Sequence, residues 1–579
     1  MMDKQFFLQF AKGRWMMLVA SFYIKSFAGP NYVFGIYSIP IKAALNYDQR
    51  TIDTLSFFKD LGQHIGIVAG LITEVMPPWV VLTIGAALNF FGYLMIWLAV
   101  THRIAPPPIW KMYLFMCVAA DSHPFANTPV MVTCLRNFPH CGSILLGFVR
   151  GFSGLSGAIF SQLYYSLYHV NGDNTQDVLL LLAWLPATVN LLFMFFVRPI
   201  KAHNSGSIED DARKENKVFF SFLYLALSIA AFLIFVIILE NQLALSFSAH
   251  KVIAAMTLLL VVSNILIAMK AQMGYPAKMQ QLDGTENSSD CTENAVSIRN
   301  EAPNVDNILH PMATSVFSKM DKALFKETAS HCSSKVDCTQ SMLYMAKFKE
   351  AFAIRGTKIG DNFTILEALL SWDMWILFIT TTCGQGAGLA AIGNIGQIGE
   401  SLGYTRASIS TLVSLMNIWT FLGRLLAGFA SEALMKKKGI PRTLAFTISI
   451  LVGCVGMLLI AMPKKGSLYG ASVIVGLSFG VQGTLFSAIM SELFGLKYYA
   501  TLFNLGSLAG PLGSYLLNVR VAGYFYDRQA ALQGGGLTCV GPHCFDTAFF
   551  IITSVSFFGS LVSGLLVLRT LAFYKTFNS

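Results

Sequence analysis

Long apolar stretches dominate this chain of 579 residues and restrict the folds open to it. Hydrophobic residues make up 54% of the sequence and charged residues only 12%, with a mean hydropathy of +0.58. A soluble domain carries about 25% charged residues, and a helix needs about 20 apolar residues to cross a bilayer. Because the stretches reach that length, we predict an all-α polytopic membrane protein.

These stretches predict about fourteen membrane spans. The first six cover 14–39, 55–76, 78–100, 109–134, 142–168 and 177–198, and two more cover 218–239 and 249–270. The last six cover 371–396, 408–431, 442–462, 468–490, 498–524 and 547–572.

A repeat relates the first six spans to the last six. The segment around Tyr47 recurs around Tyr404, 357 residues later, and at the same offset Gly423 matches Gly66. Two inserted helices leave the orientation of the chain unchanged, so the two halves are predicted to run parallel across the membrane.

The sequence therefore divides into four predicted parts. Residues 1–200 form a first bundle of six helices, 201–270 add two helices, and 366–579 form a second bundle of six helices. The polar stretch 271–365 between them is predicted to be a mostly disordered cytoplasmic linker.

Basic residues near the span ends predict the orientation of the chain, because cytoplasmic loops carry an excess of Lys and Arg. Both termini are then cytoplasmic, and the net charge of +10 needs no nucleic-acid partner. Cys539 and Cys544 fall on the other side, where we predict a disulfide. A zinc site that includes His543 is the alternative.

Several runs resemble a known family. In the first half they are GRWMMLVASFYIKSFAGPNYVFGIYS and FFKDLGQHIGIVAGLITE, and in the second half TTCGQGAGLAAIGNIGQIGESLGY and SELFGLKYYATLFNLGSLAGPLGSYLL. They resemble the nodulin-like family of plant major facilitator proteins and, more distantly, oxalate/formate and monocarboxylate carriers. The resemblance implies the major facilitator fold with alternating access. We also expect a monomer without a cofactor, in the plasma membrane or an endomembrane such as the vacuolar one.

The facilitator signature Gly-x-x-x-Asp-Arg-x-Gly-Arg-Arg is degenerate in this chain. The second half retains Gly428, Glu432 and a basic run that starts at Lys436, whereas the first half keeps Gly70 and Glu74 but continues as VMPPW. Acidic residues there can stabilise helix N-termini and act in gating. Because the first half lacks the basic residues, we predict a working latch in the second half only.

Charged residues inside the predicted spans are the main candidates for chemistry, since a charge at the bilayer centre is costly. We predict that Lys25, Asp121 and Arg150 form a solute-binding cluster; an ion pair that only locks helices together is the alternative. Asp60 and His64 share a helix face at i,i+4. With Asp121 they are our hypothesis for proton coupling, and a packed histidine is the alternative for His64.

Polar residues in the spans are further solute-binding candidates, although such residues also hold helices together. They are Asn31, Tyr32, Gln385, Asn394, Asn417, Gln482 and Asn504. Among gating candidates, Arg424 is predicted to be a structural partner of the latch. Arg520 and Asp527, seven residues apart on a similar face, are predicted to form a gate pair.

These features predict a secondary transporter of a small organic solute. Lys25, Arg150 and Arg520 make the cavity positive, which favours a carboxylate-like anion. A receptor or scaffold that signals through the linker 271–365 without transport is the alternative. We predict no enzyme activity, because the sequence shows no recognisable nucleophile–base arrangement. It also has no phosphate-binding loop for direct use of ATP.

Overall fold

The structure is a computed structural model that describes residues 4–47, 49–168, 177–200, 208–242, 247–273, 359–464, 466–533 and 539–576. Met1–Gln272 and Phe352–Ser579 together form one compact unit, and Met273–Ala351 forms a second. The predicted linker therefore lies outside the described residues except at its two ends. The described residues contain helices and no strands.

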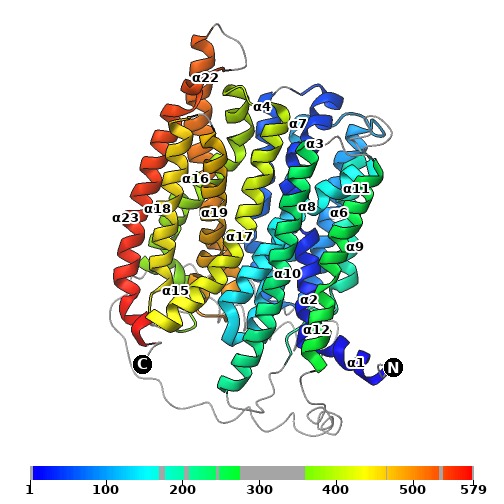
Figure 1. Cartoon of the computed structure of the whole chain (residues 1–579), viewed down its shortest axis with the longest axis vertical. Helices are drawn as coiled ribbons and strands as arrows, with labels where there is room; N and C mark the ends of the chain where they lie inside the picture. Colours follow the sequence, from blue (N-terminus) through cyan, green and yellow to red (C-terminus); the bar gives the residue numbers. More distant parts are fainter. Residues whose placement is uncertain are drawn as a thin grey trace, which may run out of the picture. The chain divides into compact units, whose positions relative to one another are not determined.

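The first half of the compact unit consists of helices that run side by side (Figure 1). They are α1 (Lys4–Lys12), α2 (Arg14–Phe27), η1 (Pro30–Val33), α3 (Phe34–Leu45), α4 (Gln49–His64), α5 (Ile67–Val75), α6 (Pro78–Val100), α7 (Ile109–Asn137), η2 (Pro139–Cys141), α8 (Gly142–Tyr168) and α9 (Asp177–Phe193). Small residues allow the close packing that holds membrane helices together. For example, a Cβ at Gly92 of α6 would lie 2.6 Å from the Cα of Ala119 on α7.

Two predicted spans of this half are broken helices. In the span at 14–39, α2 ends at Phe27 and the helix η1 begins at Pro30. The nitrogen of Pro30 carries no hydrogen to donate. The span at 55–76 is divided at Gly66 between α4 and α5. Breaks at membrane depth are tolerated where the freed backbone groups are buried in protein or line a cavity, so both breaks mark the interior of the bundle.

The two additional helices follow as α10 (Ile208–Gln242) and, with a local irregularity, α11 (Phe247–Val262) and α12 (Asn264–Met273). Arg14 Nη1 of α2 donates a hydrogen bond of 2.5 Å to Glu215 Oε1 of α10. The ring of Phe220 on α10 lies 5.4 Å from the ring of Phe429 in the second half, centroid to centroid. α10 is therefore fixed to the first half and also touches the second.

The second half repeats the helical pattern. Its elements are α15 (Ile365–Leu370), α16 (Trp372–Ser401), α17 (Arg406–Lys438), α18 (Arg442–Ala461), α19 (Ser467–Leu493), α20 (Tyr499–Ser507), α21 (Ala509–Ser514), the π-helix η4 (Tyr515–Ala522), α22 (Gly523–Leu532), η5 (Pro542–Cys544) and α23 (Asp546–Thr576). Gly476 and Gly480 form a Gly-x-x-x-Gly face on α19. A Cβ at Gly480 would lie 2.2 Å from the carbonyl oxygen of Thr420 on α17, so glycine permits this contact.

The second bundle begins earlier than residue 366. Asn362 Oδ1 accepts hydrogen bonds of 3.1 Å from the backbone N–H groups of Leu496 and Lys497. Thr364 and Glu367 then form a capping box that starts α15. Residues 359–365, which the sequence prediction assigns to the linker, thus pack onto the second half.

Eight helices in the described residues are long and apolar enough to cross a membrane. They lie at Pro78–Val100, Lys214–Leu239, Ser248–Met273, Trp372–Ser401, Thr411–Met435, Arg442–Ala461, Ser467–Leu493 and Asp546–Lys575. α9, with 17 residues, is shorter. The other predicted spans are the two broken ones, the α20–η4 run, α8 and α7, which carries polar residues in its middle. The predicted count of about fourteen is therefore not confirmed by length and composition.

The N- and C-terminal ends of the compact unit lie at one end of the bundle, which we name the termini end (Figure 1). α22 lies at the other, which we name the opposite end. α1 and α15, which precede the first long helix of each half, both lie at the termini end. The two halves therefore run parallel.

Candidate functional site at the seam between the halves

The two halves meet where α8 packs on α17 and α5 packs on α20, and we name this contact the seam. Glycine makes it possible. A Cβ at Gly147 of α8 would lie 3.2 Å from the Cα of Gly428, and a Cβ at Gly428 would lie 2.8 Å from the carbonyl oxygen of Ser143. The prediction did not assign the signature glycine Gly428 to this contact.

Lys25 is buried in the first half, with 1% of its surface exposed. Its ammonium donates a hydrogen bond to Oδ1 of Asn127 on α7. His123 lies one turn before Asn127 on the same face of α7, within electrostatic range of Lys25. The sequence prediction placed Asp121 beside Lys25. The structure gives Lys25 a neutral amide instead, because Asp121 lies on a different face of α7 from Asn127.

Arg150 and Arg424 link the two halves at the seam. Arg150 Nη1 donates a hydrogen bond to the carbonyl oxygen of Gly483 on α19, and its guanidinium carbon lies 5.0 Å from the centre of the Phe503 ring on α20. Arg424 Nη1 donates a hydrogen bond of 2.8 Å to the carbonyl oxygen of Arg150. Both guanidinium groups act electrostatically on Lys25. We name Lys25, Arg150 and Arg424 the basic cluster.

Of the proton-coupling candidates, His64 lies within electrostatic range of Arg150 in the basic cluster, whereas Asp60 and Asp121 have other surroundings. Oδ1 of Asp121 is buried and has no hydrogen-bond partner among the described residues. On α4, Asp60 Oδ1 lies 3.1 Å from the ammonium of Lys59. Nδ1 of His64 contacts the backbone carbonyl oxygen of Asp60 at 2.8 Å. The i,i+4 pair therefore meets through the backbone and not through the Asp60 carboxylate.

Asn504 joins the halves near the break between α4 and α5. Its Nδ2 donates a hydrogen bond of 2.8 Å to Thr128 Oγ1 on α7. A Cβ at Gly66 would lie 2.2 Å from Asn504 Oδ1, so the glycine at the break makes room for this side chain. Asn504 is thus a predicted polar residue that the structure places at the seam.

Among the other predicted polar residues, Asn394 has a contact inside its own half. Asn394 Nδ2 donates a hydrogen bond of 2.5 Å to Asn518 Oδ1 on η4. Gln385 Nε2 is buried without a hydrogen-bond partner in the described part of the chain, and Asn417 is partly exposed on α17. The side chains of Asn31 and Tyr32, in η1, lie outside the described residues.

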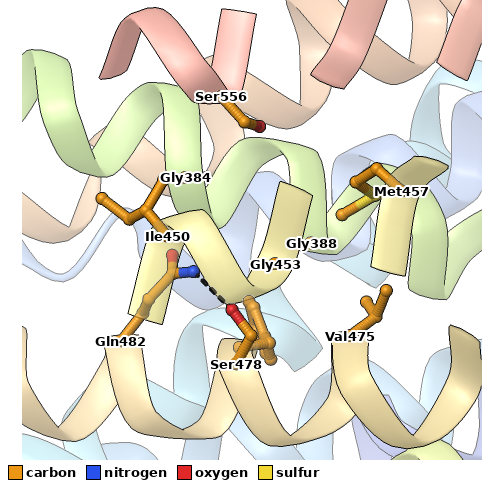
Figure 2. Close-up of a pocket in the computed structure, with 10 residues that line it drawn as sticks. Gly384, Gly388, Ile450, Gly453, Met457, Val475, Ser478, Gln482 and Ser556 are labelled. Carbon is orange, nitrogen blue, oxygen red and sulfur yellow. Dashed lines mark hydrogen bonds between the residues drawn. The ribbon is translucent and has the colours of Figure 1, made fainter. Parts of the chain in front are cut away.

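Gln482 points into a small cavity within the second half (Figure 2). The cavity has a volume of about 10 Å³ and is lined by residues of α16, α18, α19 and α23. Gln482 Nε2 donates a hydrogen bond of 2.9 Å to Ser478 Oγ. A cavity of this size holds about one water molecule. The structure therefore places Gln482 in the core of its own bundle and not at the seam, where a solute-binding role would require it.

At the termini end, Glu74 crosses the seam. Its Oε1 accepts a hydrogen bond of 3.0 Å from the backbone N–H of Ala500, in the first turn of α20, and Oε2 lies 3.9 Å from Arg136. A carboxylate at a helix N-terminus is stabilised by the unpaired N–H groups and the helix dipole. Nearby, Ser143 Oγ and Ser431 Oγ lie 2.9 Å apart across the same seam. The first half therefore also makes a contact across the seam at this end, which the expectation of a latch in the second half only did not include.

Glu74→Ala is expected to weaken closure at the termini end, because the first turn of α20 loses its acceptor from the other half. Loss of a helix-capping contact costs about 1 kcal/mol, so the ratio of closed to open protein falls by about fivefold. Oxidative cross-linking of a Ser143→Cys/Ser431→Cys pair, in cells or nanodiscs, reports the closed state. The matched control is Arg136→Gln, because Arg136 is exposed and its ion pair is weak. Equal cross-linking in both backgrounds would contradict the latch.

The predicted latch residue Glu432 is bonded within its own half. Arg442, at the start of α18, forms ion pairs with both Glu432 and Glu492. Tyr574 of α23 donates a hydrogen bond of 2.8 Å to Glu492 Oε2. Arg442 thus ties four helices together. The side chain of Lys436 lies outside the described residues.

Arg520 contacts Tyr515 and not Asp527, so the predicted gate pair is wrong. Its Nε donates a hydrogen bond of 3.0 Å to the Tyr515 hydroxyl, five residues earlier. The prediction assumed α-helical spacing, whereas residues 515–522 form a π-helix, which changes the residues that share a face.

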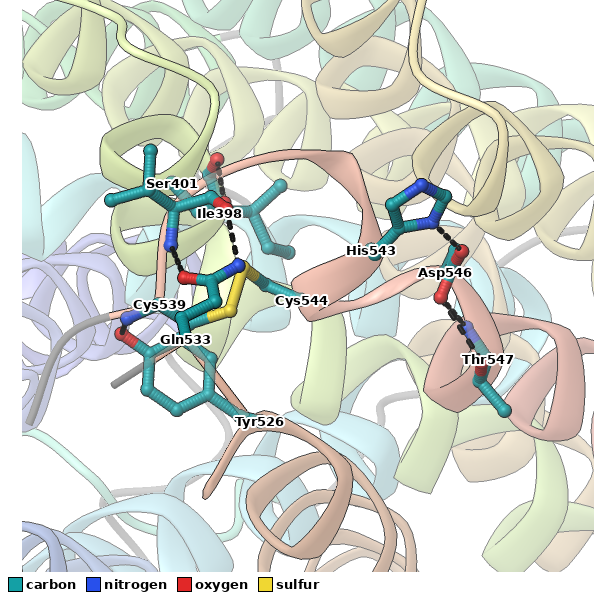
Figure 3. Close-up of a disulfide and its surroundings, with 10 residues drawn as sticks. Ile398, Ser401, Tyr526, Gln533, Cys539, His543, Cys544, Asp546 and Thr547 are labelled. Carbon is teal, nitrogen blue, oxygen red and sulfur yellow. Dashed lines mark hydrogen bonds and ion pairs between the residues drawn. A yellow bond between two sulfur atoms is a disulfide. The ribbon is translucent and has the colours of Figure 1, made fainter. Parts of the chain in front are cut away.

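Cys539 and Cys544 form a disulfide at the opposite end (Figure 3). The bridged loop is held to α16 by a hydrogen bond of 2.8 Å from the Gly541 N–H to the carbonyl oxygen of Ser401. His543 Nδ1 lies 2.8 Å from Asp546 Oδ2. No group of three metal-binding side chains occurs among the described residues, so the geometry does not favour the zinc alternative.

Comparisons with known proteins agree with this architecture. A nodulin-like family model matches residues 14–269, and a model of the NFD4 C-terminal domain matches residues 359–576. The protein NUCLEAR FUSION DEFECTIVE 4 of Arabidopsis thaliana is 25% identical over 569 residues, which cover 97% of this chain and 89% of that protein. YhjX of Escherichia coli K12, an uncharacterized MFS-type transporter, is 29% identical over 159 residues, covering 27% of this chain and 38% of its own.

The solved structure of the proton:xylose symporter XylE superposes with a TM-score of 0.53 at 10% identity, covering 96% of this chain and 95% of its own. The described helices therefore adopt the major facilitator fold of multi-pass membrane proteins, as predicted. The first part of the chain, residues 14–269, is similar to the nodulin-like family.

Proposed function

We propose that this protein is a secondary transporter that moves a small organic anion across its membrane by alternating access. The fold supports transport, because two parallel six-helix halves around a central site are the arrangement of major facilitator transporters. The basic cluster at the seam supports an anionic solute. Lys25 is buried, its hydrogen-bond partner is a neutral amide, and the guanidinium groups of Arg150 and Arg424 act on it.

A buried cation beside two others is costly, because taking a charge out of water carries a penalty of several kcal/mol per ion. A bound anion offsets this penalty. Arginine presents a planar fork of donors that matches the two oxygens of a carboxylate, so we propose a carboxylate-like solute. Arg424 takes the place that the sequence prediction gave to Arg520, which lies at the opposite end of its half.

We also propose that the termini end is cytoplasmic. Basic residues gather near the helix ends there, and cytoplasmic ends of membrane helices carry such an excess. They include Lys12, Arg14, Arg136, Arg198, Lys214, Arg442, Lys497 and Lys575.

Uptake into proteoliposomes tests the proposed function. The panel contains radiolabelled monocarboxylates and dicarboxylates, a neutral hexose and a zwitterionic amino acid. We expect uptake of at least one carboxylate and competition by other carboxylates only. Uptake of the hexose alone would contradict the anionic solute. Binding of a carboxylate without uptake, in liposomes of verified orientation, would contradict transport and favour the receptor or scaffold.

For coupling, we propose that Asp121 exchanges protons during transport. Its carboxyl group is buried at Oδ1 without a hydrogen-bond partner in the described part of the chain. Burying an ionised carboxylate without a partner is costly. Its charge therefore depends strongly on whether water reaches α7, which is the property that a coupling site needs.

Asp121→Asn is expected to abolish accumulation driven by a pH gradient and to retain exchange of labelled for unlabelled anion, because exchange needs no net proton movement. The measurement compares both activities in proteoliposomes for the anion found by the panel. Asp527→Asn is the matched control, since Asp527 is exposed on α22. A pH-gradient response equal to that of the wild type would remove Asp121 from the coupling mechanism.

A further inference from the structure

The π-helix η4 lies between α21 and α22 and contains 8 residues, Tyr515–Ala522. π-helices are rare and frequently occur at functional sites. In an α-helix each residue turns by about 100°, so residues five apart point to different faces. In a π-helix the backbone bonds join residues five apart, which places Tyr515 and Arg520 one turn apart.

The contact between Tyr515 and Arg520 follows from this geometry. Arg520 Nε donates a hydrogen bond of 3.0 Å to the Tyr515 hydroxyl, and the guanidinium carbon lies 5.4 Å from the centre of the Tyr515 ring. Arg520 itself is exposed. The side chain of Arg520 therefore holds the tyrosine ring in one orientation without being part of the packed core.

The Tyr515 ring contacts the first half. Its centroid lies 5.5 Å from that of Phe57 on α4. Phe57 precedes His64 by about two turns, and α4 begins at the opposite end (Figure 1). Glu74 and Ser143 make their contacts at the termini end. The aromatic pair thus joins the halves on the other side of His64, towards the opposite end.

The chain just before η4 is fixed tightly to α16. A Cβ at Gly513 would lie 2.2 Å from the carbonyl oxygen of Thr382, and a Cβ at Gly386 would lie 2.5 Å from the Cα of Gly513. No side chain fits at this contact, so α21 packs closely on α16 just before η4. A change in helical register then occurs after Ser514, where the π-helix begins.

We propose that Tyr515 is a gating residue of the transport cycle at the opposite end and that Arg520 positions it. In the closed state the π-helical turn holds the tyrosine ring against Phe57. A return of η4 to α-helical register breaks the contact with Arg520, turns the ring away from Phe57 and separates the halves on that side. The proposal rests on the two-halved fold and not on the charge of the solute.

Hydrogen exchange measured by mass spectrometry, on the full chain in nanodiscs without solute, tests this gate. Tyr515→Ala is expected to raise exchange in both 515–532 and 49–64, because opening exposes both sides of the contact. An aromatic pair contributes a factor of about three to ten in the closed-to-open ratio, so exchange in 49–64 should rise by about that factor. Exchange at the start of α8, near the termini-end contact, should not rise.

Two further variants separate gating from folding. Tyr515→Phe keeps the ring and removes the hydroxyl, so it should fold as the wild type and raise exchange in 49–64 by a smaller factor. Arg520→Gln should raise exchange in the same segment. The double variant Tyr515→Phe/Arg520→Gln should show no further increase over Arg520→Gln, because both changes remove the same hydrogen bond. Arg528→Gln, the same substitution on another exposed arginine of the segment, should have no effect.

A purely structural role for Tyr515 predicts that exchange rises in 515–532 alone. That result in Tyr515→Ala, with 49–64 unchanged, would overturn the gate. If Arg528→Gln had the same effect as Arg520→Gln, the positioning role of Arg520 would be overturned. Neither outcome depends on finding the solute, so failure of the anion proposal is distinguishable from failure of this one.

Discussion

Replacing Lys25 by methionine is expected to reduce uptake of the anionic solute by at least about thirtyfold, since removal of one partner of a buried charge pair costs 2–5 kcal/mol or more. The same change should not unfold the protein. Methionine has a similar length and no charge, and removing an uncompensated buried charge is neutral or stabilising. A large loss of transport without a loss of stability is the signature of a ligand-binding cation.

The measurement is initial uptake in proteoliposomes, together with thermal unfolding of the purified protein and its amount in the membrane. Lys464→Met is the matched control, because Lys464 is exposed in the loop before α19. Lys25→Arg keeps the charge and is expected to retain part of the uptake. If Lys25→Met lowered thermal stability and uptake in parallel, the hydrogen bond from Lys25 to Asn127 would be a helix lock, the alternative that the sequence left open.

The broken helices show what a sequence pattern can and cannot predict about this fold. Apolar length predicted the all-α fold correctly, because hydrophobic thickness sets helix length, although the count of about fourteen spans is not confirmed. The parallel halves were predicted from the repeat and the two inserted helices. Pro30 and Gly66 are visible as helix breakers, yet a pattern does not show whether a glycine kinks or divides a span. At the break, Gly66 leaves room for Asn504 from the other half, which occupies the space that a Cβ would need. Contacts between residues so far apart in the chain leave no signal in the local sequence.

The composition of the basic cluster was predicted in part. Lys25 and Arg150 were selected because charges in spans are rare. Their partners depend on how each helix is rotated about its axis. Asp121 and Asn127 are both polar residues of α7, and only the rotation of α7 against α2 decides which of them meets Lys25. Asn127 had a usable signal, its i,i+4 spacing from His123. Arg424 was predicted as a structural residue, and the structure places it on the backbone of Arg150.

The latch prediction missed the contact of Glu74 for a related reason. The prediction relied on the basic residues that follow the signature. Because the first half has no basic residues there, no latch was expected in that half. Glu74 instead uses a backbone N–H of α20 and the positive end of that helix, which carry no sequence signal. The acidic residue, and not the basic run, is what the contact across the seam requires.

Arg442→Gln is expected to have the largest effect on stability. Arg442 is 4% exposed and pairs with Glu432 and Glu492. Breaking a buried ion pair by removing one partner costs about 3–5 kcal/mol, because the remaining charge stays buried without compensation. Here two carboxylates lose their shared cation, while Glu492 keeps the hydrogen bond from Tyr574, so we expect a value within that range. Arg442→Lys should recover only part of it, because one ammonium lacks the fork that reaches both carboxylates.

Arg569→Gln provides the matched control for this prediction. Arg569 also pairs with an acidic residue at the end of a helix, since its Nε lies 2.5 Å from Asp373 Oδ1, but the arginine side chain is 48% exposed. Exposed ion pairs contribute about 0–1 kcal/mol. The same substitution should therefore lower the free energy of unfolding, measured on detergent-solubilised protein, several times less than Arg442→Gln does. Equal losses would mean that the Arg442 network is open to water, and that the ends of α17, α18, α19 and α23 are held by helix packing alone.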